Sequence, residues 1–534
     1  MKFFDLNSSK MKKLFALLVL TLAFANVYAQ GVAINADGSP ANASAMLDVK
    51  SSNKGMLIPR TSTAARISIA SPAKGLLLYD STTSSFWYHN GIAWVEIEQT
   101  SATAWNINGN SGTDPAINFI GTTDSKPLKF RIGNQVAGEI NGTPLYNTSL
   151  GLSAGTSNTT GSANTAFGSL ALSATTTGYD NTAMGHQALL GNSSGSNNVA
   201  IGVNAMVYSN QGNSNTAVGA GSMYSNKSGD YNTGVGMSSL SNDSSGTLNV
   251  AVGAYSMAYN KIGSFNTAIG GLSLYSISAG SENTAIGYSS LYTDSLGLNN
   301  VAVGAYSLQL NLVGDNNVAI GHRSLRSNTS GFNNTANGSD ALYFNSTGYG
   351  NCANGFNSLS KNTIGGENTA IGEQSLELNI SGGQNVAVGV STMNFNISGN
   401  NNTGTGSFSL NKNTTGNLNT AYGASALFFN QSGNNNTVIG SLAGYNTTGS
   451  ANVFLGYSAG YSETGSNKLY IANSNTSTPL IGGDFTTGTV TINSLLTLTP
   501  RTIVPSSPVR GMIYYDDTNN ILKCYDGSVW HDLW

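Results

Sequence analysis

Histidine side chains could provide acid–base or metal chemistry, and this chain contains four of them. His186 and His322 occupy equivalent positions of an internal repeat, eight repeats apart. At roughly 4.8 Å per stacked layer they would lie roughly 38 Å apart, too far to share a metal or a substrate. His89 and His531 have no companion Cys or His cluster near them in the chain. The histidines therefore predict neither a metal site nor a cofactor site.

Carboxylates on adjacent coils of one column would indicate a polysaccharide-cleaving solenoid enzyme. Glu373 and Glu377 fall in one repeat, and neither has an acidic neighbour at its own position in the repeats before and after. Arg323 and Asp340 occupy the same position in consecutive repeats, which predicts a surface ion pair of little energetic weight. The calcium-binding repeat of toxins needs Asp where this repeat has Asn. We therefore predict that the protein is not an enzyme, with no catalytic, cofactor-binding or metal-binding residues.

The internal repeat itself is the dominant feature of the chain. The pentad Asn-(Thr/Val)-Ala-x-Gly starts at Asn147 and recurs every 17 residues, without insertion or deletion, until the eighteenth copy at Asn436. Two looser copies follow, at Asn452 and Asn467. Constant spacing indicates that each copy is one coil of a stack in which equivalent residues lie above one another. This predicts an all-β fold, a parallel β-solenoid of 17-residue coils, with a rod roughly 85 Å long.

With Asn as position 1, the repeat reads N-[TV]-A-[apolar]-G-x-x-[AS]-[LM]-x-x-N-x-x-G-x-x, and we expect two short strands per coil. Side chains alternate along a strand, so positions 2 and 4, such as Val318 and Ile320, are expected to meet the Leu or Met of position 9 inside the rod. Cys352, at position 2, is then a small buried apolar residue. The polar residues found at position 4 would make the interior locally polar: Asn337, Asn354 and Thr405.

Position 1 is Asn in all eighteen regular copies. Stacked amides can bond to each other and to the turn backbone, which predicts a structural ladder. The alternative is a column of ligand-binding amides, but a binding site needs only a few positions. A third class, the ice-binding solenoids, presents flat Thr ladders. Position 2 is Thr in twelve of eighteen copies, with Val or Cys in the rest, and this interchange indicates selection for shape rather than for ice.

The apolar content of one coil bears on oligomeric state. Three sizeable apolar side chains contribute on the order of 5–8 kcal/mol, whereas ordering 17 residues costs on the order of 25 kcal/mol. Backbone bonds between coils offset part of the difference. Small residues at positions 3, 5 and 8 are expected to let further chains approach closely. We therefore predict a parallel homotrimer.

Composition and charge narrow the possible partners. Charged residues make up only 9% of the chain, the net charge is −3, and residues 147–466 contain six Lys or Arg against eleven Asp or Glu. Without a basic surface, nucleic acid is not an expected partner. Lys12-Lys13, an apolar run and Val27-Tyr28-Ala29 are typical of a secretory signal cleaved before Gln30, too short to span a bilayer. We expect a secreted protein, extracellular or on the outer cell surface, with no membrane span in the mature chain. Cys352 and Cys524 predict no disulfide framework.

The two ends of the chain are duplicates of each other. Residues 75–94 align without gaps to 511–530, and each copy follows a Pro-Arg-Thr sequence, at 59–61 and 500–502. Asn90-Gly91 and Asp526-Gly527, flanked by aromatic and apolar residues, predict β-hairpins. Their aromatic residues could form a sugar-stacking platform, but we favour a role in sealing a small core or joining three chains: Trp87, Tyr88, Trp94, Tyr525 and Trp530.

These features predict a linear order of segments. They are an export signal at 1–29, an N-terminal β-hairpin module at 30–97, a β connector at 98–146, the solenoid rod at 147–466, a second β connector at 467–499, and a C-terminal β-hairpin module at 500–534.

Several repeats carry a family resemblance. Asn-Val-Ala-Ile-Gly at 198–202 and 317–321, and the matching pentads starting at 266, 283 and 368, closely resemble the head repeats of bacterial trimeric autotransporter adhesins. The resemblance implies a left-handed parallel β-roll, three chains about a common axis, and binding to surfaces through the outside of the rod. The flanking segments 118–131 and 465–471 look like connectors in secreted bacterial repeat proteins related to phage tail fibres. The terminal modules are then the candidates for nucleating trimerisation.

The sequence thus predicts a secreted structural fibre that acts as a bacterial surface adhesin, with surface glycans or matrix proteins as possible ligands. The leading alternative is a tail-fibre-like receptor-binding component of an injection particle, which the export signal disfavours. A polysaccharide-cleaving β-solenoid enzyme is the third possibility.

Overall fold

The computed structural model describes residues 31–97, 109, 111–114 and 116–533. The predicted export signal at 1–29 lies outside these residues. The chain divides into two compact units, Met1–Ile120 and Gly121–Trp534. Among the described residues, no helix is both long and apolar enough to cross a bilayer.

The N-terminal unit contains six strands and one short helix: β1 (Val32–Asn35), β2 (Leu47–Lys50), β3 (Arg60–Thr61), α2 (Thr63–Ile67), β4 (Leu77–Asp80), β5 (Ser85–His89) and β6 (Trp94–Ile97). β1 and β2 form a separate parallel pair. β3 lies parallel to β4, and β4, β5 and β6 form an antiparallel meander. The predicted Asn90-Gly91 turn joins β5 to β6, which confirms this hairpin.

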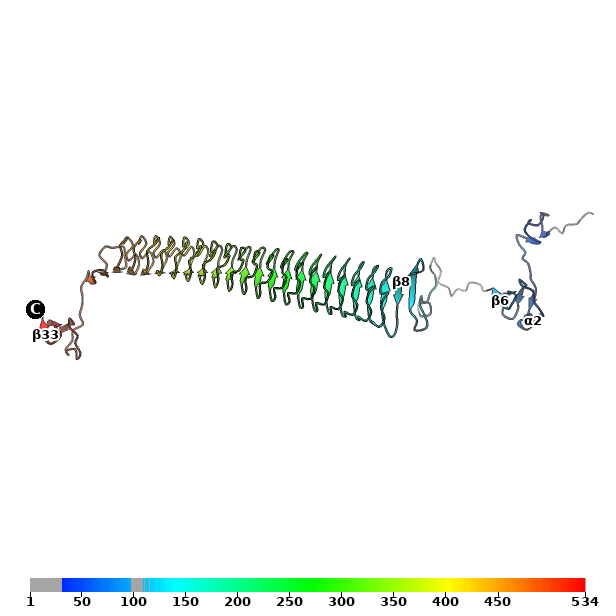
Figure 1. Ribbon diagram of the computed structural model, residues 1–534, viewed down its shortest axis with the longest axis horizontal. Helices are drawn as coiled ribbons and strands as arrows, with labels where there is room; N and C mark the ends of the chain where they lie inside the picture. Colours follow the sequence, from blue (N-terminus) through cyan, green and yellow to red (C-terminus); the bar gives the residue numbers. More distant parts are fainter. Residues whose placement is uncertain (1–30, 98–108, 110, 115, 534) are drawn as a thin grey trace, which may run out of the picture. The chain divides into compact units, whose positions relative to one another are not determined.

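Twenty short strands form the solenoid: β9 (Thr148–Leu150), β10 (Thr165–Phe167), β11 (Thr182–Met184), β12 (Val199–Ile201), β13 (Thr216–Val218), β14 (Thr233–Val235), β15 (Val250–Val252), β16 (Thr267–Ile269), β17 (Thr284–Ile286), β18 (Val301–Val303), β19 (Val318–Ile320), β20 (Thr335–Asn337), β21 (Cys352–Asn354), β22 (Thr369–Ile371), β23 (Val386–Val388), β24 (Thr403–Thr405), β25 (Thr420–Tyr422), β26 (Thr437–Ile439), β27 (Val453–Leu455) and β28 (Lys468–Ile471). Each strand pairs in parallel with the next, and the regular coils keep one register, with Thr284 opposite Val301. The strands form one continuous row along the rod (Figure 1). The predicted parallel β-solenoid of 17-residue coils is confirmed.

Antiparallel strands cover both ends of this row: β7 (Leu128–Ile132), β8 (Gln135–Ile140), β29 (Ile481–Asp484) and β30 (Thr489–Ile492). β8 pairs with β9 at one end, and β29 pairs with β28 at the other. Hairpins at these positions satisfy the backbone groups that an uncovered end coil would present to another chain. A final meander follows: β31 (Ile513–Asp516), β32 (Ile521–Tyr525) and β33 (Trp530–Asp532).

The orientation of the strand side chains differs from the prediction. Each coil contains one three-residue strand, not two, and its middle residue at position 3 points inward: Ala268 and Ala285 are 0% exposed. Positions 2 and 4 point outward. Position 9 is buried as expected, as in Leu291, but in a run of turns. The interior of so short a coil has room for small residues at positions 3 and 8 and one Leu or Met at position 9, so the larger strand residues stay outside.

Volume compensation near the C-terminal end of the rod confirms that positions 3 and 9 share the interior. Phe454 replaces the Ala of position 3 there, and it is 1% exposed. Position 9 of the same coil is Gly460, and position 9 of the preceding coil is Gly444. A Cβ added to Gly460 would lie 2.8 Å from the Phe454 ring. One large side chain therefore takes the space that two residues share elsewhere.

The predicted Asn ladder at position 1 is confirmed. Asn266 is fully buried, its backbone N–H donates to Asn249 Oδ1 at 3.0 Å, and its Nδ2 donates to the Gly280 carbonyl at 2.9 Å. The sequence frame showed Asn at position 12 as well, and this position forms a second ladder that the prediction missed. Asn345 Nδ2 donates to Asn328 Oδ1 at 2.8 Å, one coil earlier.

Glycine at position 15 is required by close packing between coils. A Cβ built on Gly263 would lie 2.3 Å from the Gly280 carbonyl oxygen of the next coil, a distance that no side chain tolerates. The same carbonyl row accepts the Asn side chains of both ladders, as Gly263 does from Asn249 and Asn260. The glycine at position 15 and the Asn ladders at positions 1 and 12 therefore belong to the same turn of each coil.

Replacing one ladder amide is expected to loosen its coil. In Asn232→Ala, the Gly246 carbonyl loses a donor at 2.7 Å and the Asn249 N–H loses an acceptor at 3.0 Å, both in the dry interior. Each unsatisfied buried group costs ~1–3 kcal/mol. Hydrogen exchange of peptides covering 232–248 is expected to accelerate at least tenfold, and Ser228→Ala, an exposed change nearby, leaves it unchanged. Equal exchange in the two variants would contradict a structural ladder.

Candidate functional site

The outward strand face is the most regular surface of the rod. We define it as the side chains at positions 2 and 4 of the coils from β9 to β27. At position 4 large apolar residues are partly exposed: Ile201 by 38%, Ile269 by 41% and Ile320 by 42%. No Lys, Arg, Asp or Glu occupies either position in these strands. Position 4 therefore forms an uncharged and mainly apolar stripe beside the Thr and Val of position 2. Exposed apolar surfaces of this kind occur at protein or membrane contacts and in ligand-binding grooves.

Residues assigned to the interior by the sequence prediction lie on this face instead. Asn337 and Asn354 are exposed, and Thr405 is half-buried, so the prediction of a locally polar interior was wrong. Cys352 is also half-buried here and not enclosed in the core. The prediction that further chains approach over positions 3, 5 and 8 is wrong for positions 3 and 8, because these small residues are buried within their own coil, as Ala251 and Ser256 are. A second chain can reach only positions 2 and 4 of the strand.

The residues considered for chemistry lie on the rod surface and remain separate. His186 and His322 are exposed at position 6, and the nearest ring to His322 is Tyr306, at 6.1 Å between centroids. Glu373 is exposed, and Glu377 accepts a hydrogen bond from Asn394 at 2.9 Å. Within the described part of the chain, no three His, Cys, Asp or Glu residues are grouped as a metal site would require.

The predicted surface ion pair is confirmed. Arg323 Nη2 lies 2.8 Å from Asp340 Oδ2, one coil later. The Arg323 side chain is 42% exposed, whereas the Asp340 side chain is 14% exposed and mostly covered. It contributes little stability.

Aromatic columns run along another part of the rod surface, at positions 10 and 11. Tyr275 and Tyr292 stack with centroids 5.0 Å apart and ring planes 4° from parallel. Tyr445 and Tyr461 stack at 4.9 Å and 7°. Because stacked rings cover each other's faces, a sugar ring could stack only on the terminal ring of such a column. Edges and hydroxyl groups remain available along its length.

Two carboxyl groups interrupt the second Asn ladder. Asp243 and Asp294 are 0% exposed at position 12. Oδ1 of each accepts a backbone N–H at 2.8 Å, from Gly246 and Gly297, and Oδ2 of each has no hydrogen-bond partner. Burial raises the pKa of both groups to about 7, since the charged form loses its hydration. The sequence shows Asp in a column of Asn residues. Only the structure shows that these two carboxyl groups are buried.

The aromatic residues of the N-terminal module do not form one sugar platform. Arg66 on α2 lies with its guanidinium carbon 3.6 Å from the centroid of Trp87, and its Nε is 2.8 Å from Asp80 Oδ2. Burial alone would raise the pKa of Asp80, but hydrogen bonds from Arg66 and neighbouring groups lower it to about 2. Tyr88 points to the other side of the sheet, since it neighbours Trp87 in β5. Trp94 lies 5.4 Å from the buried His89 ring.

The C-terminal module also uses its aromatic residues internally. Trp530 packs 4.6 Å from Tyr514 and 5.2 Å from Tyr525, between ring centroids. These contacts agree with the favoured interpretation that the rings seal a small core.

Comparison with known proteins gives one match. Residues 33–111 match the family model described as "Phage tail like trimerisation region". No curated protein and no solved structure matches the chain. A segment similar to a trimerisation region, placed before a β-solenoid, is the organisation of a trimeric, fibre-like structural protein.

Proposed function

We propose that this protein is a secreted homotrimeric fibre that acts as a surface adhesin, in which the solenoid holds binding surfaces away from the cell. The observation that carries this proposal is the outward strand face, an uncharged apolar surface along the length of the rod, in a chain with a segment similar to a trimerisation region. Three such faces packed about a common axis would remove these side chains from water.

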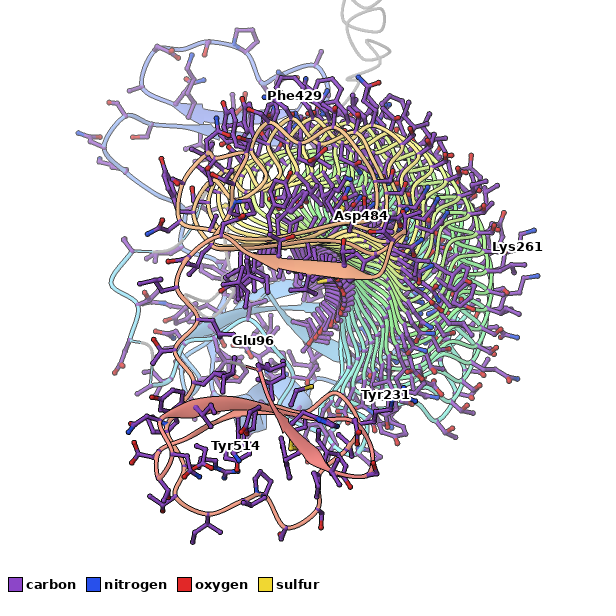
Figure 2. The ribbon with its side chains drawn as sticks, turned by 90° about the vertical axis from the view of Figure 1, so that its left-hand side faces the viewer. Glu96, Tyr231, Lys261, Phe429, Asp484 and Tyr514 are labelled. Atoms are coloured by element: carbon purple, nitrogen blue, oxygen red, sulfur yellow. The ribbon has the colours of Figure 1, made fainter. Side chains whose placement is uncertain are left out.

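The shape of the rod is compatible with this packing. Viewed along its length, successive coils turn gradually relative to one another (Figure 2). The outward strand face therefore twists with the rod, and three chains would wind around each other. Each chain would leave its aromatic columns and its Arg323–Asp340 pair on the outside.

Cys352 provides a direct test of this geometry, because it lies in the outward strand face at position 2 of β21. In a Cys524→Ser background, a three-armed maleimide is expected to link Cys352 of three chains into a covalent trimer. Dilution over a hundredfold before reaction excludes random collisions. A protein that sediments as a trimer but yields only singly modified chains would place the contact elsewhere on the rod.

The adhesin function requires a ligand on the outside of the trimer. Arrays of surface glycans and of matrix proteins, probed with the full chain, are expected to give saturable binding. Because stacked rings cover one another, we expect binding to depend on the edges and ends of half-buried columns such as Phe428–Tyr445–Tyr461. Binding unaffected by Tyr461→Ala would remove this column from the candidates. Absence of binding to every array would contradict the adhesin proposal.

A tail-fibre-like receptor-binding component is the second candidate, supported by the description of the matched family model. The two candidates differ in export. Removal of residues 1–29 from protein recovered outside the cell supports the adhesin, whereas an uncleaved chain within cytoplasmic particles supports the fibre of an injection particle. We further propose that neither form is an enzyme; release of reducing ends from a panel of polysaccharides would overturn this.

A further inference from the structure

The two terminal modules share one backbone arrangement, residue for residue. In the N-terminal module Leu77 pairs with Tyr88, and in the C-terminal module Ile513 pairs with Cys524, each partner 436 positions later. The backbone hydrogen bonds that flank the strands are also the same in the two modules. Gly75 N donates to the His89 carbonyl at 2.7 Å, and Gly511 N donates to the Tyr525 carbonyl at 2.7 Å.

Smaller details are also repeated. Asp80 Oδ1 accepts the backbone N–H groups of Thr82 and Thr83, at 2.9 and 3.3 Å. Asp516 Oδ1 accepts those of Thr518 and Asn519, at 3.0 and 3.3 Å. The C-terminal module is therefore a second copy of the structure that lies within the segment similar to a trimerisation region.

In the N-terminal module the two faces of the meander differ in what covers them. One face is closed by its own chain: Leu78 is 3% exposed and Asp80 is 0% exposed, beneath Arg66. The opposite face has no cover within the described part of this unit. Its exposed apolar residues come from all three strands of the meander: Leu77 by 38%, Phe86 by 46%, Tyr88 by 37% and Ile97 by 46%. We call this the bare face.

The C-terminal module has changed its covered face but kept its bare face largely apolar, with His531 at the position of Val95 as the exception; its ring lies 2.6 Å from Asp526 Oδ2. It lacks a counterpart of α2, and Lys523 stands in place of Trp87, 3.5 Å from Asp516. On the bare face, Ile513 is 48% exposed and Leu533 is 43% exposed, at the positions of Leu77 and Ile97. Leu522 and Cys524 are half-buried beside them. The bare face keeps its apolar character where the covered face does not, which indicates that the bare face contacts something outside its own chain.

We propose that the C-terminal module is a second trimerisation unit, whose bare face packs against the same face of two further copies of this chain. The occupant is another copy because the module repeats the structure of a segment similar to a trimerisation region, and because the surface is largely apolar. The three chains would then be joined by one module that precedes the solenoid in the sequence and by another that follows it. Joining at both places fixes the register of the three rods. The inference rests on the proposed trimeric fibre.

Cys524 lies on the bare face and reports directly on this contact. In a full chain carrying Cys352→Thr, the three-armed maleimide is expected to give a covalent trimer through Cys524. The paired change Ile513→Asp with Leu533→Asp is expected to abolish this product, because it places six carboxylates in the contact. Ser506→Asp, an exposed change in the same module, is expected to preserve it.

The outcomes separate the inference from the proposed function. Sedimentation as a trimer, with Cys524 modified only singly, overturns the second trimerisation unit and leaves the trimeric fibre intact. Should Cys524 prove unreactive in the native protein, the denaturant midpoint of trimer dissociation decides: equal midpoints for Ile513→Asp/Leu533→Asp and Ser506→Asp overturn the inference. Sedimentation as a monomer overturns both.

Discussion

Two carboxylates placed in the outward strand face, as in Ile269→Asp with Ile286→Asp, are expected to weaken the trimer strongly while each rod stays folded. The two residues are 41% and 38% exposed in the single chain, at position 4 of consecutive coils. In the trimer these two positions would be shielded from water, and six carboxylates would face one another. Positions 2 and 4 of the outward strand face contain no Lys or Arg that could neutralise them. Burying an unpaired charge costs several kcal/mol, so the dissociation constant is expected to rise at least ~100-fold.

Matched variants isolate the effect of charge on this face. Ser228→Asp with Ser245→Asp introduces the same two charges at exposed positions of consecutive coils outside the outward strand face, and it is expected to leave sedimentation unchanged. Ile269→Thr with Ile286→Thr preserves the trimer, since Thr405 already occupies this column. Circular dichroism is expected to show folded rods throughout, because the side chains at all four changed positions point away from the coil interior. Because the terminal modules could still join the chains, the dissociation constant decides: an unchanged value in Ile269→Asp/Ile286→Asp would exclude the outward strand face as a contact.

The repeat allowed the solenoid to be predicted, whereas the direction of its side chains was assigned wrongly. Because side chains alternate along a strand, either positions 2 and 4 or position 3 could face the core. The large Val and Ile at positions 2 and 4 favoured the first assignment. The signal that decides the phase was present in the sequence. Position 4 varies from Val to Tyr422 without compensation, as an outside position can. Position 3 is Ala, Gly or Ser until two coils near the C-terminal end, where Val438 and Phe454 occur together with Gly444 and Gly460 at position 9.

The terminal hairpins were predictable for a different reason. Each hairpin turn depends on two adjacent residues, Asn90-Gly91 or Asp526-Gly527. Such a turn can be predicted from the local sequence without knowledge of the remaining fold. Which sheet face is covered depends on Arg66 reaching Asp80 and Trp87 from a helix in a non-repeated segment. That contact joins residues distant in sequence, and neither composition nor spacing indicates it.

Replacing the two buried carboxyl groups by amides, in Asp243→Asn with Asp294→Asn, is expected to stabilise the rod at neutral and alkaline pH. In the unfolded chain these groups ionise near pH 3.8, whereas burial raises their pKa to about 7 in the folded rod. Between these values the folded state holds protons that the unfolded state has released. Stability is therefore highest below pH 4, falls as the pH rises toward 7, and is constant above it. A tenfold change in proton affinity corresponds to ~1.4 kcal/mol. The contribution of each group to the free energy of unfolding therefore falls by ~4 kcal/mol across this range.

An amide removes this dependence and adds a donor. In the coils with Asn at position 12, Nδ2 donates to the position 15 carbonyl, as Asn260 does to Gly263 at 3.0 Å. Asp243 Oδ2 and Asp294 Oδ2 make no such bond. Hydrogen exchange corrected for intrinsic rates provides a local measurement that does not require two-state unfolding. Between pH 4.5 and pH 8, protection of peptides covering 232–248 and 283–299 is expected to fall in the natural chain and stay constant in the double variant.

Peptides covering 351–367 serve as the internal control, since that coil has Asn362 at position 12. Their protection is expected to be independent of pH in both proteins. If the coils of Asp243 and Asp294 behaved like this control in the natural chain, their carboxyl groups would not be titrating near neutrality. If instead the double variant lost protection at pH 8, an ionised carboxylate would be making a contact that an amide cannot replace. The expected gain follows because the turn around position 12 provides a column of carbonyl acceptors and, among the described residues, no Lys or Arg side chain pairs with Asp243 or Asp294 to balance a negative charge.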